Sequence, residues 1–263
     1  MSKEPLKTYA QLHIIQRFMH VSVRRLKIRL LRLWLSKACL LCDAAIIDEQ
    51  PICEPCKLDL PWLQHGCQFC ALPVPAGERS CHQCQQQLQP FRQAAAAWSY
   101  DFPVNTLISR FKYNSQWPYG RLLAQMLAEY LEFQYQEARL IRPDFLLAVP
   151  LANKRQRQRG YNQAQMIAQW LSRDLHIPLL YKAAQRIRYT SIQQGLTASQ
   201  RHSNMRNAFR IVQPEQVAGQ HIAIVDDVLT TGATCAALTR SLLAAGASRV
   251  DVYCLARTGF ATG

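Results

Sequence analysis

Residues 222–234, with the sequence IAIVDDVLTTGAT, place an apolar run, two adjacent acids and a hydroxyl-rich glycine turn in direct succession. The run from His221 to Val225 is apolar and β-branched enough to predict a buried parallel strand, and Ala233 to Ala245 has the pattern of a helix. The acids and threonines are therefore expected on a strand-to-helix turn. Because ligands of open α/β sheets bind at such turns, this segment predicts both an α/β fold and a binding site.

The residue types of this turn suit the two ends of a ribose 5-phosphate. A helix N-terminus offers free N–H groups and a positive dipole end to a phosphate, and Gly232 lets the backbone approach it. Asp226 and Asp227 suit the hydroxyl end, because carboxylates accept hydrogen bonds from vicinal hydroxyls and help to hold Mg²⁺ on a polyphosphate. The predicted phosphate-binding residues are Thr230, Thr231, Gly232, Ala233 and Thr234.

A purely structural alternative exists for part of this segment. A strand that ends in Asp and leads into Thr and Gly can be an N-capped helix in any doubly wound protein, and an isolated Asp-Asp pair would favour that interpretation. The complete string is more specific. It resembles the phosphoribosyl pyrophosphate (PRPP) motif of type I phosphoribosyltransferases.

A second strand-to-turn segment follows Phe145–Val149, and four basic residues lie between Lys154 and Arg159. If the first turn holds the 5-phosphate, the pyrophosphate of PRPP needs a cradle of its own. Alone, the basic run fits a solvated or nucleic-acid-facing loop equally well, and the first motif favours the cradle. The predicted pyrophosphate-binding residues are Leu151, Ala152, Asn153 and Lys154.

Eight cysteines form four Cys-x2-Cys pairs with a period of fourteen residues. Two such pairs supply four thiolates that close tetrahedrally on Zn²⁺, and so short a module buries too little apolar surface to fold without the metal. We therefore expect two structural zinc ions with no open coordination position. The predicted ligands are Cys39, Cys42, Cys53, Cys56, Cys67, Cys70, Cys81 and Cys84.

Spacing alone leaves the pairing of the four cysteine pairs open between a sequential and an interleaved arrangement, and the sequential one is simpler. A redox dithiol is disfavoured, because such a motif opens a helix in a βαβ unit and does not recur four times. His65 and His82 are expected at the surface. Ten cysteines without a secretory signal indicate a reducing compartment, and the cytoplasm is the expected location.

The formal charge of +14 is concentrated near the N-terminus, where residues 1–37 contain nine Lys or Arg and one Glu. Leu26, Leu30 and Leu33 share one face of a basic amphipathic helix that could contact nucleic acid or an anionic membrane. A packing helix, or an upstream extension before a start at Met19, accounts for the segment equally well. Arginines interrupt every apolar run, so no transmembrane segment is predicted.

A glutamine-rich stretch near Pro90 marks a change in composition, which predicts three parts: 1–37, a zinc-ribbon domain 38–90, and an α/β domain 91–263. In the last part, strand and helix patterns alternate, which is typical of a parallel sheet flanked by helices. Strands are expected at 94–100, 145–149 and 249–256, and helices at 106–113, 120–136 and 160–174.

The order of motifs along residues 38–258 resembles that of the ComF/GntX family. The resemblance rests on the cysteine module, the PRPP motif and four short segments: Phe111–Tyr113, Arg159–Gln163, Gln194–Leu196 and Asn207–Phe209. It implies a double zinc ribbon fused to a type I phosphoribosyltransferase fold, in proteins associated with natural transformation and the use of external DNA. The base-selecting hood of salvage enzymes has no evident counterpart, which disfavours simple base salvage.

By the same resemblance, Asp226 and Asp227 would bind ribose hydroxyls, and Leu151–Lys154 would bind pyrophosphate with Mg²⁺. Arg186–Arg210 would be a mobile loop that closes over polyphosphate, although a basic groove for nucleic acid has the same composition. If a general base is needed, Asp227 is the candidate.

Two functional classes follow from the sequence. One is a PRPP-dependent transferase with an unidentified acceptor, and the other is a non-enzymatic DNA-uptake factor that binds single-stranded DNA and other uptake proteins.

Overall fold

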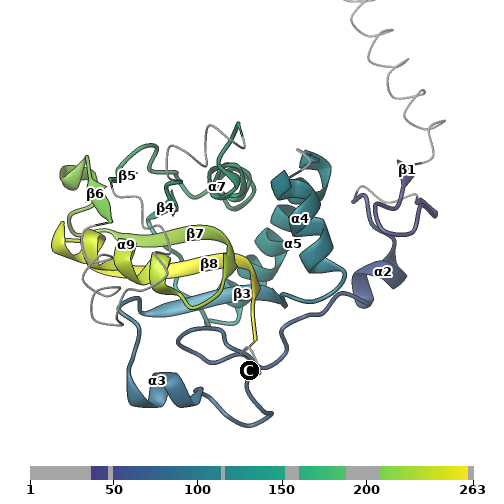
Figure 1. The fold of residues 1–263 in the computed structure, drawn as a ribbon, viewed down its shortest axis with the longest axis horizontal. Coiled ribbons are helices and arrows are strands. Elements are labelled where there is room, and N and C mark those ends of the chain that lie inside the picture. The colour runs from purple at the N-terminus through teal and green to yellow at the C-terminus, as the bar shows by residue number, and fades with distance from the viewer. Residues whose placement is uncertain (1–36, 47–49, 114–115, 152–159, 188–207, 260–263) are drawn as a thin grey trace, which may run out of the picture. The chain divides into compact units, whose positions relative to one another are not determined.

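The computed structural model describes residues 37–46, 50–113, 116–151, 160–187 and 208–259 (Figure 1). The chain divides into two compact units, residues 1–58 and 59–263. The predicted basic helix lies outside the described residues, except for Lys37. The boundary near Pro90 stays a prediction.

The described part of the first unit is a small module around one cysteine cluster. Strands β1 (Lys37–Ala38) and β2 (Ala45–Ile46) pair in antiparallel fashion, and α2 spans Glu54–Leu58. Among its described residues, the buried apolar side chains are those of Cys39, Ile46 and Ile52. So few buried groups stabilise a fold only weakly, which agrees with the need for a metal.

The second unit is built on a four-stranded parallel sheet in the order β3-β8-β7-β4, which confirms the predicted fold class (Figure 1). Every residue of β8 after the first is buried, and so are the first five of β7, as expected for strands covered on both faces. The strands are β3 (Gln93–Ser99), β4 (Phe145–Ala148), β7 (His221–Leu229) and β8 (Arg249–Arg257).

Helices α4, α5 and α7 gather on one side of this sheet, where α5 contacts β3 and β8 while α7 contacts β4 and β7 (Figure 1). The apolar face predicted for the α7 region is confirmed, because Ala164, Ile167, Ala168 and Leu171 are all buried. No described helix has the length and apolarity that a membrane crossing requires. The helices are α3 (His82–Gln86), α4 (Val104–Tyr113), α5 (Trp117–Gln136), α7 (Gln163–Leu175), α9 (Ala233–Ala244) and the 3-10 turn η1 (Pro214–Gln216).

Strand β7 is longer than the sequence predicted, and this corrects the expected position of the two acids. The strand continues to Leu229, so Asp226 and Asp227 lie within it and only Thr230–Gly232 form the turn. The reason is the length of β8, which runs beside β7 to its end and pairs Leu229 with Arg257. The sequence prediction ended the strand at the first charged residue, although a neighbouring strand supplies hydrogen bonds beyond it.

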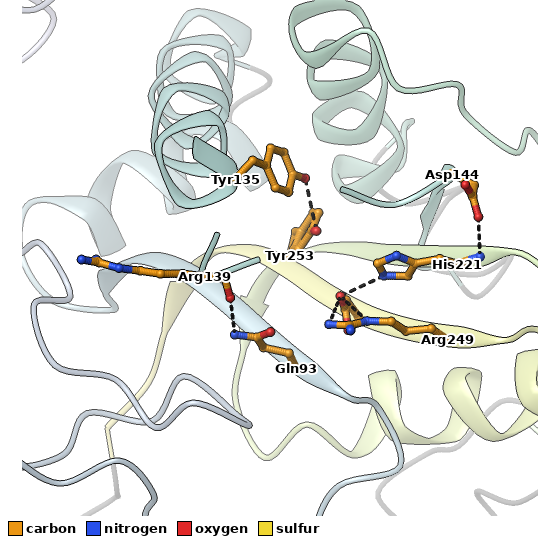
Figure 2. Close-up of polar contacts among 8 residues, drawn as sticks. Gln93, Tyr135, Arg139, Asp144, His221, Arg249 and Tyr253 are labelled. Atoms are coloured by element: carbon orange, nitrogen blue, oxygen red, sulfur yellow. Dashed lines mark hydrogen bonds and ion pairs between the residues drawn. The ribbon is translucent and has the colours of Figure 1, made fainter. Parts of the chain in front are cut away.

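The amino ends of β7 and β8 carry a buried polar network (Figure 2). The carboxylate of Asp251 is fully buried and accepts hydrogen bonds from Arg249 Nε at 3.1 Å and from His221 Nε2 at 2.9 Å. The backbone N–H of His221 donates to the Asp144 carboxylate at 2.8 Å. Tyr253 lies beside this network and accepts a hydrogen bond from the Tyr135 hydroxyl at 3.2 Å. Each of these polar groups therefore has a partner, which is typical of a structural network.

Candidate functional site

The opposite, carboxyl edge of β7 leads into a glycine turn, Thr230–Gly232, and then into α9. Gly232 has a φ of 75°, in the left-handed region that favours glycine, and it is the N-cap of α9. Thr230 and Thr231 are exposed, while Ala233 and Thr234 in the first turn of α9 are half-buried. The turn therefore presents hydroxyls and the N–H groups of a helix N-terminus at the place where the sequence predicted a phosphate site. Ala233 N–H donates to Thr231 Oγ1 at 3.4 Å.

Asp227 lies close enough to Asp226 to oppose the ionisation of the Asp226 carboxyl. Burial and then the charge of Asp227 raise the pKa of Asp226 from 3.8 to about 7. Asp227 forms an ion pair with Lys112, whose Nζ lies 3.0 Å from Asp227 Oδ2, and both side chains are mostly buried. The backbone N–H of Asp227 also donates to Asp226 Oδ1 at 2.9 Å. The charged form of Asp226 is therefore disfavoured, whereas the carboxylate of Asp227 is paired with the ammonium group of Lys112.

Lys112 reaches the acids because two of the short motifs converge beside them. The Tyr161 hydroxyl donates to the carbonyl of Phe111, and Gln163 Nε2 donates to the carbonyl of Lys112 at 3.5 Å. Asn162 caps α7 by accepting from Gln165 N–H at 3.4 Å, which explains why the helix begins later than predicted. The segments 111–113 and 159–163, far apart in sequence, are therefore neighbours of the acidic pair.

The predicted pyrophosphate cradle begins at the same edge. Val149 N–H donates to the carbonyl of Val225 at 2.9 Å, so the chain leaves β4 beside the residue that precedes Asp226. Leu151 is half-buried there. Ala152, Asn153 and Lys154 lie outside the described residues, and their predicted role stays a prediction.

The predicted mobile loop begins and ends on a short antiparallel ladder. Strands β5 (Ala184–Arg186) and β6 (Phe209–Ile211) pair, so its two described ends are adjacent. Arg186 is among the cations whose charge lowers the pKa of Asp226 and so partly offsets the effect of burial. Residues 188–207 lie outside the described part of the chain.

The cysteines gather into two clusters, and the pairing is sequential. We call Cys39, Cys42, Cys53 and Cys56 the first cluster and Cys67, Cys70, Cys81 and Cys84 the second; in each, the sulfur atoms lie within 4.8 Å of one another. The Cys42–Cys53 and Cys70–Cys81 sulfur separations are 3.7 Å and 3.6 Å. Tetrahedral zinc with bonds of about 2.3 Å sets sulfur atoms about 3.8 Å apart, so both clusters fit it.

The pKa values of the cluster thiols shift in both directions: burial raises those of Cys56, Cys70 and Cys84, whereas those of Cys39 and Cys67 are lowered. Burial raises the pKa of Cys39 and Cys67, but backbone N–H groups that donate to the sulfurs outweigh it and bring the values to about 6 and about 7. His65 and His82 are exposed, as predicted. The two cysteine quartets, with their double-zinc-ribbon sequence, therefore support two structural zinc sites.

Sequence reasoning missed one residue of this region. Arg257 is the last residue of β8, only 5 % exposed, and its guanidinium donates to the carbonyls of Leu229 and Thr230 at the start of the glycine turn. Nothing in the sequence distinguishes it from any basic residue that ends an apolar strand. Only the sheet register reveals its position.

Known proteins show the same organisation. The double zinc ribbon domain matches residues 30–93, and the phosphoribosyl transferase domain matches 162–261. The DNA utilization protein YhgH of Escherichia coli K12 is 34% identical over 84% of this chain and 96% of its own length. Competence protein F of Haemophilus influenzae is 32% identical over 80% of this chain and 92% of its own. A solved purine phosphoribosyltransferase from Pyrococcus horikoshii, with 23% identity and a TM-score of 0.32, covers 51% of this chain and 70% of that one. Because the YhgH protein and competence protein F are more than 30% identical over most of both chains, the chain belongs to the ComF/GntX family.

Proposed function

We propose that this protein binds PRPP with Mg²⁺ at the carboxyl edge of its sheet, and that the binding serves the use of external DNA. The observation that carries the proposal is the placement of Asp226 and Asp227 near the carboxyl end of β7, where only Val228 and Leu229 separate them from the glycine turn that opens α9. One edge thus offers acceptors for ribose hydroxyls and donors for a phosphate. A carboxyl whose pKa is raised by burial and by a neighbouring acid, as in Asp226, is favoured at a binding site and disfavoured in a purely structural strand.

In this proposal Asp226 and Asp227 accept hydrogen bonds from the ribose hydroxyls, and the 5-phosphate binds the N–H groups and hydroxyls of Thr230–Thr234. The segment after β4, beginning at Leu151, would face the pyrophosphate. Mg²⁺ would neutralise charge on the pyrophosphate. Lys112 Nζ lies 3.0 Å from Asp227 Oδ2, and this ion pair holds the Asp227 carboxylate in position at the edge.

If the bound PRPP reacts, the bond between the ribose C1 and the pyrophosphate oxygen breaks, and positive charge develops at C1. The acceptor supplies the electron pair for the new bond, and its proton needs a base. Asp227 is the candidate, because its carboxylate lies at the same edge of the sheet as the proposed ribose site.

A second candidate function, binding of single-stranded DNA, is favoured by exposed aromatic side chains near the junction of α4 and α5. Tyr113 and Trp117 are 68% and 53% exposed, on either side of the junction between α4 and α5. Arg110 stacks on Tyr119 with its guanidinium carbon 5.3 Å from the ring centre. Exposed aromatic rings among basic groups are a stacking platform for unpaired bases. The names of the two relatives, a DNA utilization protein and a competence protein, agree with a DNA ligand. We expect the binding to take place in the cytoplasm.

Calorimetry with Mg²⁺ and PRPP tests the first function. The wild-type chain should release or take up heat on binding, and a double variant, Asp226→Ala with Asp227→Ala, should not. An Arg142→Gln variant, changed at an exposed ion pair, is the control and should bind like wild type. Absence of binding to the wild type would sink the assignment. Pyrophosphate released in the presence of candidate acceptors then distinguishes a transferase from a sensor.

Fluorescence anisotropy with labelled single-stranded DNA tests the second function. We expect affinity to fall steeply with salt because phosphate contacts release counterions, and to fall by about tenfold in Trp117→Ala, which removes one stacking surface. Leu243→Ala, another exposed apolar position, is the matched control. Equal affinity of the Trp117→Ala variant and the wild type would exclude this platform, and deletion of 1–37 would then show whether the basic segment binds instead.

A further inference from the structure

A single buried arginine connects the second cysteine cluster to the glycine turn. Arg257 Nε donates to the carbonyl of Cys70 at 3.0 Å, and Arg257 Nη1 donates to the carbonyls of Leu229, at 2.9 Å, and Thr230. The side chain is 5 % exposed. One planar guanidinium therefore bonds at once to a zinc-ligand residue and to the start of the turn, a geometry for which its fixed fork of donors is suited.

The segment that contains Cys70 is itself held in place by strand β3 of the sheet. The carbonyl of Phe69, between the two cysteines of its pair, accepts from Ala94 N–H at 2.9 Å. A Cβ placed on Gly232 would lie 3.8 Å from Gln89 and from the Phe91 ring, so the segment that leaves the second cluster also passes close to the turn. All four thiols of the second cluster are buried. Metal at this cluster therefore constrains the position of the Cys70 carbonyl.

At the glycine turn, the hydrogen bonds from Arg257 fix the direction in which the backbone N–H groups of Thr230 and Thr231 point. A peptide unit is planar and trans, so its C=O and N–H point in opposite directions. When Arg257 holds the carbonyls of Leu229 and Thr230, the N–H groups of Thr230 and Thr231 are directed away from Arg257. The hydrogen bonds from Arg257 thus orient these two backbone donors toward the side of the turn where an anion would bind.

The charge of Arg257 points to the same ligand class. Within the described ranges, Arg257 has no carboxylate partner, and its hydrogen bonds go to neutral carbonyl and hydroxyl oxygens. A buried guanidinium without a counter-charge is costly. A phosphate monoester at the glycine turn would supply the missing negative charge.

We propose that Arg257 couples the second cysteine cluster to the glycine turn, so that zinc in that cluster and a phosphate monoester at the turn stabilise each other's binding. This rests on the proposed function, because it takes the turn to be a phosphate site. Coupling of this kind is reciprocal: if zinc orders the turn for phosphate, phosphate slows the loss of zinc from the second cluster and not from the first.

Zinc release into a chromogenic chelator tests the coupling on the full-length chain. The wild type should lose zinc in two phases, and a Cys42→Ser variant, which breaks the exposed first cluster, should keep only the slower one. Saturating ribose 5-phosphate, which needs no Mg²⁺, should slow that phase about fivefold or more and leave the fast phase unchanged. Calorimetry on the same samples records whether ribose 5-phosphate binds.

Arg257→Lys should abolish the slowing, because one ammonium cannot reproduce the fork that spans both sides. Arg249→Lys changes the other end of the same strand and should retain it. Asp251→Asn, a destabilised variant with Arg257 intact, should also retain it, which separates coupling from general loss of stability.

Three results would overturn the inference. Ribose 5-phosphate that binds but leaves zinc release unchanged disproves the coupling and leaves the proposed function standing. Slowing that survives in Arg257→Lys shows that the coupling runs through other residues. Absence of binding of both ribose 5-phosphate and Mg²⁺ with PRPP disproves the proposed function, and the inference falls with it.

Discussion

The two ends of strand β7 place acids in opposite surroundings. At the amino end, Asp251 of the neighbouring strand is fully buried, yet Arg249 and His221 donate to its carboxylate (Figure 2). At the carboxyl end, Asp226 has an acid as its nearest charged neighbour, and burial with that charge raises its pKa to about 7. At the amino edge of the sheet the charge of Asp251 has partners of opposite charge. At the carboxyl edge, burial and a neighbouring acid disfavour the charge of Asp226.

The difference between the two edges distinguishes acids that stabilise the fold from acids that we expect to bind a ligand. A paired carboxylate adds to the stability of the native chain, while an opposed one subtracts from it unless a ligand compensates. Selection for folding alone would not maintain Asp226 and Asp227 side by side. The comparison therefore predicts that amide substitutions at the two edges change stability in opposite directions.

The largest effect is expected at the paired edge. Asp251→Asn leaves Arg249 and His221 beside a neutral group, and we expect the free energy of unfolding to fall by about 3 kcal/mol. Urea unfolding followed by tryptophan fluorescence measures it. Glu132→Gln, at an exposed ion pair with Arg142, is the control and should cost about 0.5 kcal/mol or less. Equal losses in the two variants would mean that the network contributes no more than a surface pair.

The opposite sign is expected at the acidic pair. Asp226→Asn keeps an oxygen that accepts from Asp227 N–H and removes the disfavoured charge, so at pH 8 the variant should be more stable than wild type by about 1–3 kcal/mol. The same urea measurement applies. A loss of stability at pH 8 would contradict the electrostatic account of this edge.

The stability that Asp226→Asn gains over wild type should depend on pH in a defined direction. The pKa of Asp226 is higher in the folded chain, at about 7, than its ordinary value of 3.8, so the folded state binds the proton more tightly. The wild type keeps this contribution below about pH 4 and loses it as the pH rises to about 7. The difference between Asp226→Asn and wild type should therefore vanish near pH 4 and reach a plateau above pH 7, as unfolding curves at a series of pH values would show.

A smaller effect is expected from the cation beside the acids. Lys112→Met removes the partner of Asp227 and should lower stability at pH 8 by about 1 kcal/mol. It also removes a charge that lowers the pKa of Asp226, so the carboxyl carbon resonance of Asp226 should titrate at a higher pH than in wild type. An unchanged titration would show that Lys112 does not act on the pair in solution.

Local patterns in the sequence predicted the strands of the parallel sheet, its longer helices and the eight cysteines that cluster in two groups of four, because apolar periodicity and ligand spacing are local properties. Local patterns do not predict the strand order β3-β8-β7-β4, because in it two strands from late in the chain lie between two strands from early in the chain. For the same reason the acids were placed on the turn and not within β7. The approach of Lys112 to Asp227, and of Arg257 to Thr230, follows from that order and could not be read from spacing.

Calorimetry with Mg²⁺ and PRPP on Asp226→Asn beside wild type, at pH 8, tests the central claim that this edge holds a disfavoured charge for a ligand. We predict that the variant, although more stable, binds PRPP about tenfold more weakly or worse, because a charged hydrogen-bond acceptor for the ribose is lost. The Asp251→Asn variant, although less stable, should bind like wild type while it is folded. PRPP affinity that is unchanged in Asp226→Asn would contradict the account.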